Sequence, residues 1–235
     1  MQIIWHGQSC FQFVSNLGKG NNINIVIDPF SEDIGLRLPK LEADILLVTH
    51  KHQDHNNTKA ISGAPFLIDG PGEYEAKGVF IQGIPSFMIP AERDEMKKRT
   101  QFSSPHDENL GKERGESTIY TIETEGLRLC HLGDFGQKEL SSEQLDKIGE
   151  IDILLIPVGG VYTISAKEAV RVMSQIEPSI VIPMHYQLPK LKLKLDGLDA
   201  FLKAAGVKKV EALANLSIKK KDILSEEAKI IVLNS

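Results

Sequence analysis

Short apolar runs bounded by Gly, Pro, Asp or Asn recur along the whole chain and predict buried β-strands. Runs this short favour strands over helices, because a helix needs about 10 residues or more to present a stable apolar face. The predicted strands cover residues 23–27, 44–48, 119–122, 127–130, 152–156, 180–182 and 229–233.

Helix start and stop signals lie between several of these runs. Ser141 and Ser165 each stand three residues before a Gln or Glu, the spacing of a capping box, in which the two side chains bond each other's backbone N–H groups. We expect helices from Ser141 to about Gly149, from Ser165 to about Glu177 and over residues 198–205. Because strands and helices alternate in both halves of the chain, the sequence predicts an α/β or α+β protein with a largely buried sheet.

The composition is that of an ordinary globular protein. The chain has 235 residues, of which 41% are hydrophobic and 25% are charged, and its net charge is −5. A mildly acidic chain without a long basic segment disfavours tight, non-specific binding to nucleic acid. Residues 91–115 are polar and charged and too long for an ordinary connection, so we expect a functional loop or a partly disordered segment there.

Targeting and redox features are few. No stretch approaches the ~20 apolar residues of a membrane helix. The first residues contain no charged leader, and the two cysteines, Cys10 and Cys130, form no CxxC motif. We therefore expect a cytoplasmic protein without a disulfide framework or a membrane partner.

The strongest chemical pattern follows the predicted strand at residues 44–48. Histidine is scarce, with seven in the chain, yet His50, His52 and His55 fall within six residues, with Asp54 beside the last. Imidazole and carboxylate are usual ligands of zinc and similar ions. His50 and His52 on an extended segment would face one ion, and the turn that follows would direct Asp54 and His55 to a second. The alternative is a solvated polar turn.

Further candidate ligands stand at other strand exits. His185 ends the run at residues 180–182, and His131 with Asp134 follows the run at 127–130. Each alone is more often a structural residue, but their recurrence at strand ends indicates a shared metal site. His106, beside Asp107 in the polar segment, is by sequence alone better explained as a surface residue.

These motifs together resemble those of the metallo-β-lactamase superfamily. The similarity is closer still to a branch of metal-dependent hydrolases related to the ascorbate-6-phosphate lactonases. Besides the HxHxDH run, the motifs are PGEYE at 71–75, HD at 106–107 with Gly111, Arg114 and Gly115, HLGD at 131–134, PVGGVYT at 157–163 and IPMHY at 182–186. The resemblance implies a four-layer αββα sandwich, formed as one domain over residues 1–235 with two similar halves that divide near residue 120.

The resemblance also implies the roles of the ligands. It implies two sets joined by one residue: His50, His52 and His106 on one ion, Asp54, His55 and His185 on the other, and Asp134 between them. His131 would then be a partner of Asp134 rather than a ligand. Asp28, before Pro29, is either a similar supporting residue or a turn former.

Two departures from the family pattern stand out. Gln8 occupies the position where a histidine is usual, which leaves the role of that side chain open. A charged insertion at about residues 88–103 precedes His106 and would form a lid over the site or a homo-oligomer contact.

Such a site would hydrolyse its substrate with metal-activated water. Two divalent ions about 3.5–4 Å apart, zinc or else manganese or iron, would activate a bridging hydroxide for attack on an ester, lactone or phosphodiester of a small molecule. Asp54 would orient the nucleophile, and Tyr186 is a candidate donor to the developing oxyanion, with ordinary packing as its alternative. Arg114 would contact an anionic substrate or form an ion pair. A nuclease of the same superfamily and a non-enzymatic metal-binding protein are the competing hypotheses.

Overall fold

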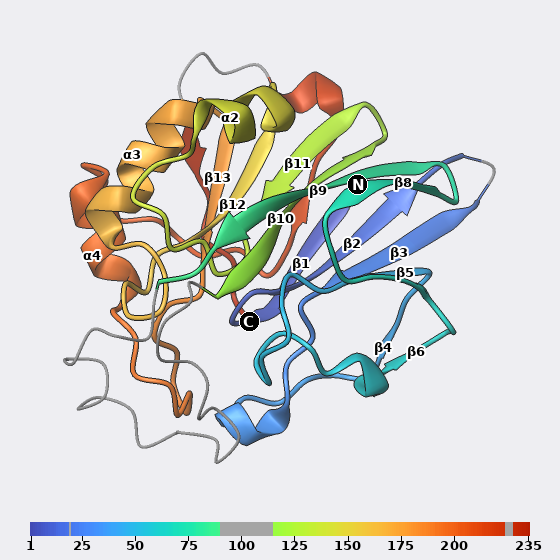
Figure 1. Ribbon diagram of the computed structural model, residues 1–235, viewed down its shortest axis with the longest axis horizontal. Coiled ribbons are helices and arrows are strands. Elements are labelled where there is room, and N and C mark those ends of the chain that lie inside the picture. The colour runs from blue at the N-terminus through green and yellow to red at the C-terminus, as the bar shows by residue number, and fades with distance from the viewer. Residues whose placement is uncertain (19, 90–114, 224–227) are drawn as a thin grey trace.

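The computed structural model describes residues 1–18, 20–89, 115–223 and 228–235. Two large β-sheets pack against each other, and α-helices cover the outer face of one of them (Figure 1). One hydrophobic cluster joins the facing sides of the two sheets, with Trp5, Phe11 and Phe13 from the first sheet and Tyr120 and Leu129 from the second. The predicted buried sheet is therefore a pair of sheets that share a core.

The first sheet combines a meander with a parallel extension. Its six strands are β1 (Gln2–Gly7), β2 (Cys10–Asn16), β3 (Asn22–Ile27), β5 (Ile45–Leu47), β7 (Phe66–Ile68) and β14 (Leu216–Ser217), in the order β14-β1-β2-β3-β5-β7. β1 to β3 are antiparallel, whereas β3, β5 and β7 run parallel. The carboxyl ends of β3 and β5 therefore lie at the same edge of the sheet.

The second sheet has the same mixed character. Its seven strands are β8 (Gly72–Ala76), β9 (Val79–Phe87), β10 (Glu116–Thr124), β11 (Leu127–His131), β12 (Ile153–Pro157), β13 (Ile180–Met184) and β15 (Lys229–Ile230), in the order β15-β13-β12-β11-β10-β9-β8. β11, β12, β13 and β15 are parallel. The parallel strands β12 and β13 are buried at every position, as expected for strands covered on both faces.

The three predicted helices are confirmed. They are α2 (Ser142–Ile148), α3 (Ala166–Ile176) and α4 (Leu198–Ala204), and they lie together on one side of the second sheet (Figure 1). Both predicted capping boxes are present, with Ser141 and Ser165 as the N-cap residues. α3 buries Ala169, Val172 and Ile176 against the core, which is the spacing of one helix face.

The outer face of the first sheet has a different cover. In the described part of the chain it includes two short 3-10 helices, η1 (Glu32–Ile34) and η2 (Thr58–Ala60), and a small sheet of β4 (Leu41–Glu42) and β6 (Ile61–Ser62), with Leu191 and Leu195 from a later loop. A second hydrophobic cluster, which includes Phe30, lies beneath this cover. The α-helical layer on this side of the expected sandwich is thus replaced, among these residues, by turns and short strands.

The sheets do not follow the predicted halves of the chain. Residue 120 lies within β10, and the second sheet takes β8 and β9 from before it, whereas the first sheet takes β14 from after it. The division into two similar halves therefore stays a prediction. The run at residues 229–233 forms a shorter strand than expected, Lys229–Ile230.

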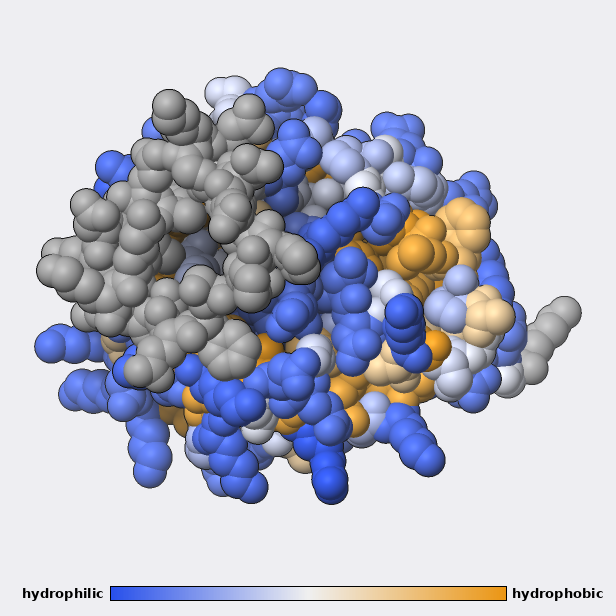
Figure 2. Space-filling view, turned by 60° about the horizontal axis from the view of Figure 1, so that its bottom comes forward, coloured by the Kyte–Doolittle hydropathy of each residue, from blue (hydrophilic) through white to orange (hydrophobic). Residues whose placement is uncertain are grey.

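The surface view is mainly hydrophilic, with hydrophobic side chains gathered over a smaller area (Figure 2). Among the described residues, no helix is long and apolar enough to cross a membrane. The predicted cytoplasmic location is not tested by this observation and stays a prediction. Most of the insertion at residues 88–103, together with His106 and Arg114, lies outside the described residues.

Candidate metal centre

The loop after β5 carries the HxHxDH run into the space where the two sheets meet. The N–H of His55 donates to the carbonyl of His52 (3.0 Å), which closes a turn around Asp54. The N–H of Thr118 in β10 donates to the carbonyl of Thr49 (2.9 Å), so the loop is attached to the second sheet. This attachment brings residues of the first sheet's loop beside the ends of β11 and β13.

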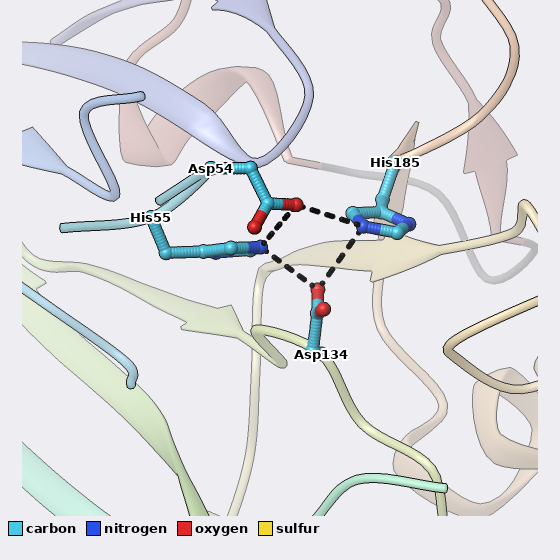
Figure 3. A group of neighbouring side chains, drawn as sticks. All are labelled: Asp54, His55, Asp134 and His185. Carbon is cyan, nitrogen blue, oxygen red and sulfur yellow. Dashed lines mark ion pairs between the residues drawn. The ribbon is translucent and has the colours of Figure 1, made fainter. Parts of the chain in front are cut away.

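Four side chains from three loops converge at this place. Asp54, His55, Asp134 and His185 each offer a ligand atom, and these atoms all lie within 4.8 Å of one another (Figure 3). Nε2 of His55 lies 3.4 Å from Asp54 Oδ2 and 3.2 Å from Asp134 Oδ1. Nε2 of His185 lies 3.9 Å and 3.4 Å from the same two oxygens. The nitrogens and oxygens therefore surround one point, as the ligands of a single ion do.

His50 and His52 lie to one side of this group. Nε2 of His50 is 3.8 Å from Asp134 Oδ2, the carboxylate oxygen that does not face His55. The rings of His50 and His52 are 4.7 Å apart and nearly perpendicular. His50 is buried and His52 is exposed. His50 thus lies beside the second oxygen of Asp134, and His52 lies beside His50 at the more open side of the cluster.

A buried carboxylate behind the cluster fixes two of the imidazoles. Asp28, at the end of β3, accepts hydrogen bonds from the N–H and the hydroxyl of Thr49 (both 2.8 Å) and from Nδ1 of His55 (2.9 Å). Because the Thr49 hydroxyl gives its proton to Asp28, it must accept the contact at 3.0 Å from Nδ1 of His50. Both rings therefore carry hydrogen on Nδ1, which leaves Nε2 free for a metal.

Burial keeps His50 neutral, whereas neighbouring imidazoles keep Asp134 ionised. Burial and, to a smaller extent, the neighbouring His55 lower the pKa of His50 to about 3, against the raising effect of the Asp134 carboxylate. Burial alone would raise the pKa of Asp134, but the imidazoles of His185 and His55 outweigh this and hold it below its usual range. A neutral imidazole and an ionised carboxylate are the forms that bind a metal ion.

His55 experiences the opposite balance. Burial would lower its pKa, but the carboxylates of Asp134, Asp54 and Asp28 together raise it well above its usual range. Without a metal, the excess of carboxylate charge is thus compensated by a proton on His55. The cluster attracts positive charge, and a divalent cation would compensate it better than one proton.

Several buried polar atoms of the cluster lack a hydrogen bond. In the part of the chain that the structure describes, these include Nε2 of His50, His55 and His185 and Oδ1 of Asp134. Buried polar atoms without a partner are rare and costly, by about 1–3 kcal/mol each. The unpaired atoms belong to ligand types that zinc, manganese and iron accept, so these residues fit a divalent metal ion.

Comparison with known proteins agrees with this chemistry. A family model described as a β-lactamase superfamily domain matches residues 2–185, a span that includes every predicted metal ligand. A UPF0173 protein of Pyrococcus abyssi is 31% identical over 200 residues, which cover 79% of this chain and 83% of the relative. A UPF0173 metal-dependent hydrolase of Methanobrevibacter smithii is 32% identical over 209 residues, with 79% and 82% covered.

Among solved structures, a candidate Zn-dependent hydrolase of the metallo-β-lactamase superfamily from Thermotoga maritima superposes with a TM-score of 0.72. It is 33% identical, and the match covers 99% of this chain and 97% of that one. The chain belongs to the metallo-β-lactamase superfamily. Within the superfamily it belongs to UPF0173, several members of which are named metal-dependent hydrolases. The predicted fold class is confirmed, whereas the relation to the ascorbate-6-phosphate lactonases stays a prediction.

The hydrogen bonds of His131 distinguish it from the candidate metal ligands. Its Nε2 lies 3.0 Å from the carbonyl of Ser9, to which it donates, and its Nδ1 accepts from the N–H of Gly133 (3.1 Å). Both ring nitrogens are therefore used by the backbone. These bonds favour a supporting role for His131 over direct metal binding, and its partnership with Asp134 stays a prediction.

Close packing around the ligands requires glycine at two positions. A Cβ on Gly133, whose φ is +56°, would lie 2.9 Å from the side chain of Thr49. A Cβ on Gly159 would lie 2.2 Å from the carbonyl oxygen of His185. The absence of side chains at these positions lets the loop that carries Asp134 approach Thr49, and lets the turn after β12 approach His185.

Tyr186 lies in the hydrophobic core rather than among the converging ligands. Its ring is 5.1 Å from that of Trp5, and only 6% of the residue is exposed. Burial raises the pKa of its hydroxyl, so this group keeps its proton at neutral pH. Its role as a donor to substrate stays a prediction.

Sequence reasoning missed the part that Thr49 plays. Its hydroxyl connects the carboxylate of Asp28 with the ring of His50, a role that no pattern in the sequence predicted. Its position directly before the first ligand is the one available indication. For Asp28, the alternative of a supporting residue is the one that the contacts favour.

Proposed function

We propose that the chain hydrolyses an ester, lactone or phosphodiester of a small molecule with two divalent metal ions. The observation that carries this proposal is the orientation of the Asp134 carboxylate. Its Oδ1 faces His55 and His185, while its Oδ2 faces His50. A carboxylate whose two oxygens face two groups of ligands is suited to bridge two ions.

The two groups differ in completeness among the described residues. Asp54, His55 and His185 with Asp134 would bind one ion. His50 and His52 with Asp134 would bind the other, and His106, as the family resemblance implies, would complete that group. Zinc is the first candidate for this set of nitrogen and oxygen ligands, with manganese and iron as alternatives.

The chain's own residues would then prepare the reaction. Bound ions would supply an activated water and stabilise negative charge on the oxygen of the group under attack. The Asp54 carboxylate, 17% exposed, would orient the attacking water and accept its proton. The net charge of −5 favours a small molecule over a nucleic acid as substrate.

The experiment combines metal analysis with a substrate panel. Purified protein should contain close to two ions per chain and should hydrolyse at least one member of a panel containing a phosphodiester, an ester, several lactones and a β-lactam. The variant Asp134→Asn keeps the size of the side chain but should lose metal and activity. The matched control Asp222→Asn changes the last residue of η3 (Lys220–Asp222) and should resemble the wild type.

Each other outcome would indicate a different function for the protein. Wild type without bound metal would refute the site. Two bound ions without hydrolysis of any substrate would indicate a non-enzymatic metal-binding protein. Salt-sensitive binding and cleavage of RNA or DNA would indicate a nuclease.

A further inference from the structure

Gln8 forms hydrogen bonds with two of the candidate metal ligands, Asp54 and His185. It lies in the turn between β1 and β2, fully buried, with a φ of +52°. Its Nε2 donates to Asp54 Oδ2 at 3.1 Å. Its main-chain carbonyl accepts from the N–H of His185 at 3.1 Å. One residue therefore connects Asp54 and His185, which come from different sheets.

The orientation of the Gln8 amide is determined by its partner. A carboxylate only accepts hydrogen bonds, so the NH₂ group and not the carbonyl of Gln8 must face Asp54. The bonded oxygen, Oδ2, is the same one that faces Nε2 of His55 and His185. The contact thus acts on the atom that would bind the ion.

The backbone of Gln8 is itself held in place. Its carbonyl also accepts from the indole N–H of Trp5 at 2.9 Å, and the Trp5 ring packs on Tyr186, the residue after His185. Both Gln8 and His185 have left-handed backbone conformations, with φ of +52°. Such conformations are unfavourable for residues other than glycine, so they persist only where surrounding contacts favour them.

We propose that Gln8 is a positioning residue that orients Asp54 for metal binding and keeps it aligned with His185. This inference rests on the proposed metal site, and it assigns a role to the side chain that stands where the family usually has histidine. A glutamine amide donates a hydrogen bond without carrying charge, so it fixes the carboxylate without competing with the metal ion. A supporting contact of this kind typically contributes 10- to 100-fold to metal affinity.

The first experiment measures zinc binding to metal-free protein in competition with a chromophoric chelator. Gln8→Met keeps the length of the side chain and removes the donor, and it should weaken one zinc site by about 10- to 100-fold. Gln8→His restores an N–H donor and should return the affinity to within about threefold of wild type. The control Gln12→Met, in which the lost amide contacts Asn24 on the sheet instead, should bind zinc as wild type does.

The second experiment needs no metal. Thermal unfolding in excess chelator is compared for Gln8→Met, Asp54→Ala and the double variant. If the contact exists, the double variant should lose less than the sum of the two single losses in melting temperature, by about 2–4 °C.

The outcomes separate this inference from the proposed function. Wild type that binds no zinc refutes the metal site, and the unfolding cycle then decides alone whether Gln8 fixes Asp54. Two ions bound with equal affinity in wild type and Gln8→Met overturn the inference and leave the proposed function intact. Failure of Gln8→His to recover affinity, or strictly additive losses of melting temperature, also overturns it.

Discussion

Two buried histidines, His55 and His131, are both influenced by the carboxylates of Asp28 and Asp134, yet their hydrogen-bond partners differ in kind. Neither residue is exposed to solvent. Both nitrogens of His131 are bonded to backbone groups of Ser9 and Gly133. His55 is anchored at Nδ1 by Asp28, and its Nε2 has no hydrogen bond among the described residues. A buried histidine is thus a candidate ligand when one nitrogen is anchored and the other is unpaired.

The electrostatic surroundings differ in the same way. Burial lowers the pKa of His131, so its ring is neutral at physiological pH. Three carboxylates raise the pKa of His55 despite its burial. The surroundings of His131 therefore stabilise a neutral ring with both nitrogens hydrogen-bonded, whereas the carboxylates around His55 favour binding of a cation.

The largest effect should come from the carboxylate on which the ligand groups converge. Asp134→Ala should remove at least one ion per chain and reduce hydrolysis by about 10³-fold, because an electrostatic stabiliser is lost from the active site. Elemental analysis and rates on any substrate found in the panel would measure this. Two ions retained per chain would contradict the bridging role.

A variant of His131 should have a large effect of a different type. His131→Ala should reduce the free energy of unfolding by about 2–4 kcal/mol, because it leaves a cavity and two unpaired backbone groups. Metal content should remain that of wild type. Chemical denaturation and elemental analysis test both statements, with His6→Ala, a half-buried histidine of β1, as the control that should cost less. Loss of metal from His131→Ala would contradict the distinction between His131 as a structural residue and His55 as a metal ligand.

The next largest effect should come from Asp28, the carboxylate that accepts a hydrogen bond from Nδ1 of His55. Asp28→Asn keeps the size of the side chain but removes the charge that anchors His55, and zinc affinity should fall about 10- to 100-fold. Chelator competition measures the change. Asp44→Asn is a suitable control, because Asp44 pairs with Lys77 away from the centre.

The smallest effect is a dependence on pH. Zinc must displace the proton of His55, so apparent affinity should rise by about tenfold per pH unit for the one proton released, up to the pKa of His55 in the metal-free protein. In the metal-free protein, the contribution of His55 to the free energy of unfolding should instead decrease as pH rises. The folded-state pKa of His55 is raised above its unfolded value, so its contribution to stability is complete below about pH 6.5 and is lost as pH rises through the folded-state pKa.

Calorimetric titration in two buffers of different ionisation enthalpy would count the released protons. His131→Ala should release the same number as wild type. Zinc affinity that does not change between pH 6 and 8 would show that His55 is already neutral.

Local patterns predicted the elements of the fold better than their arrangement. Apolar runs and capping boxes identified most central strands and all three described α-helices, because both depend on neighbouring residues. The sheet order depends on pairs far apart in sequence, such as Gln2 with Ser217, which no local pattern encodes. The turn-rich cover of the first sheet was likewise absent from the predicted sandwich.

The candidate site shows a similar limit. His50, Asp54, His55, Asp134 and His185 were identified because strand exits meet at one edge, and the structure brings them together. The different character of His131 depends on a backbone carbonyl of Ser9, more than a hundred residues away. The orientation of a ring nitrogen is a property of tertiary contacts, so spacing along the chain could only suggest it.

The pairing of β1 with β14 has a consequence for how the molecule is made. During synthesis at about 5–20 residues per second, the outer edge of β1 waits about 10–40 s for residues 216–217 to be added. Throughout that interval a strand bearing Ile3 and Trp5 exposes unpaired backbone groups on the ribosome. β1 is thus synthesised long before its partner β14, and it is among the last strands of the first sheet to be fully paired.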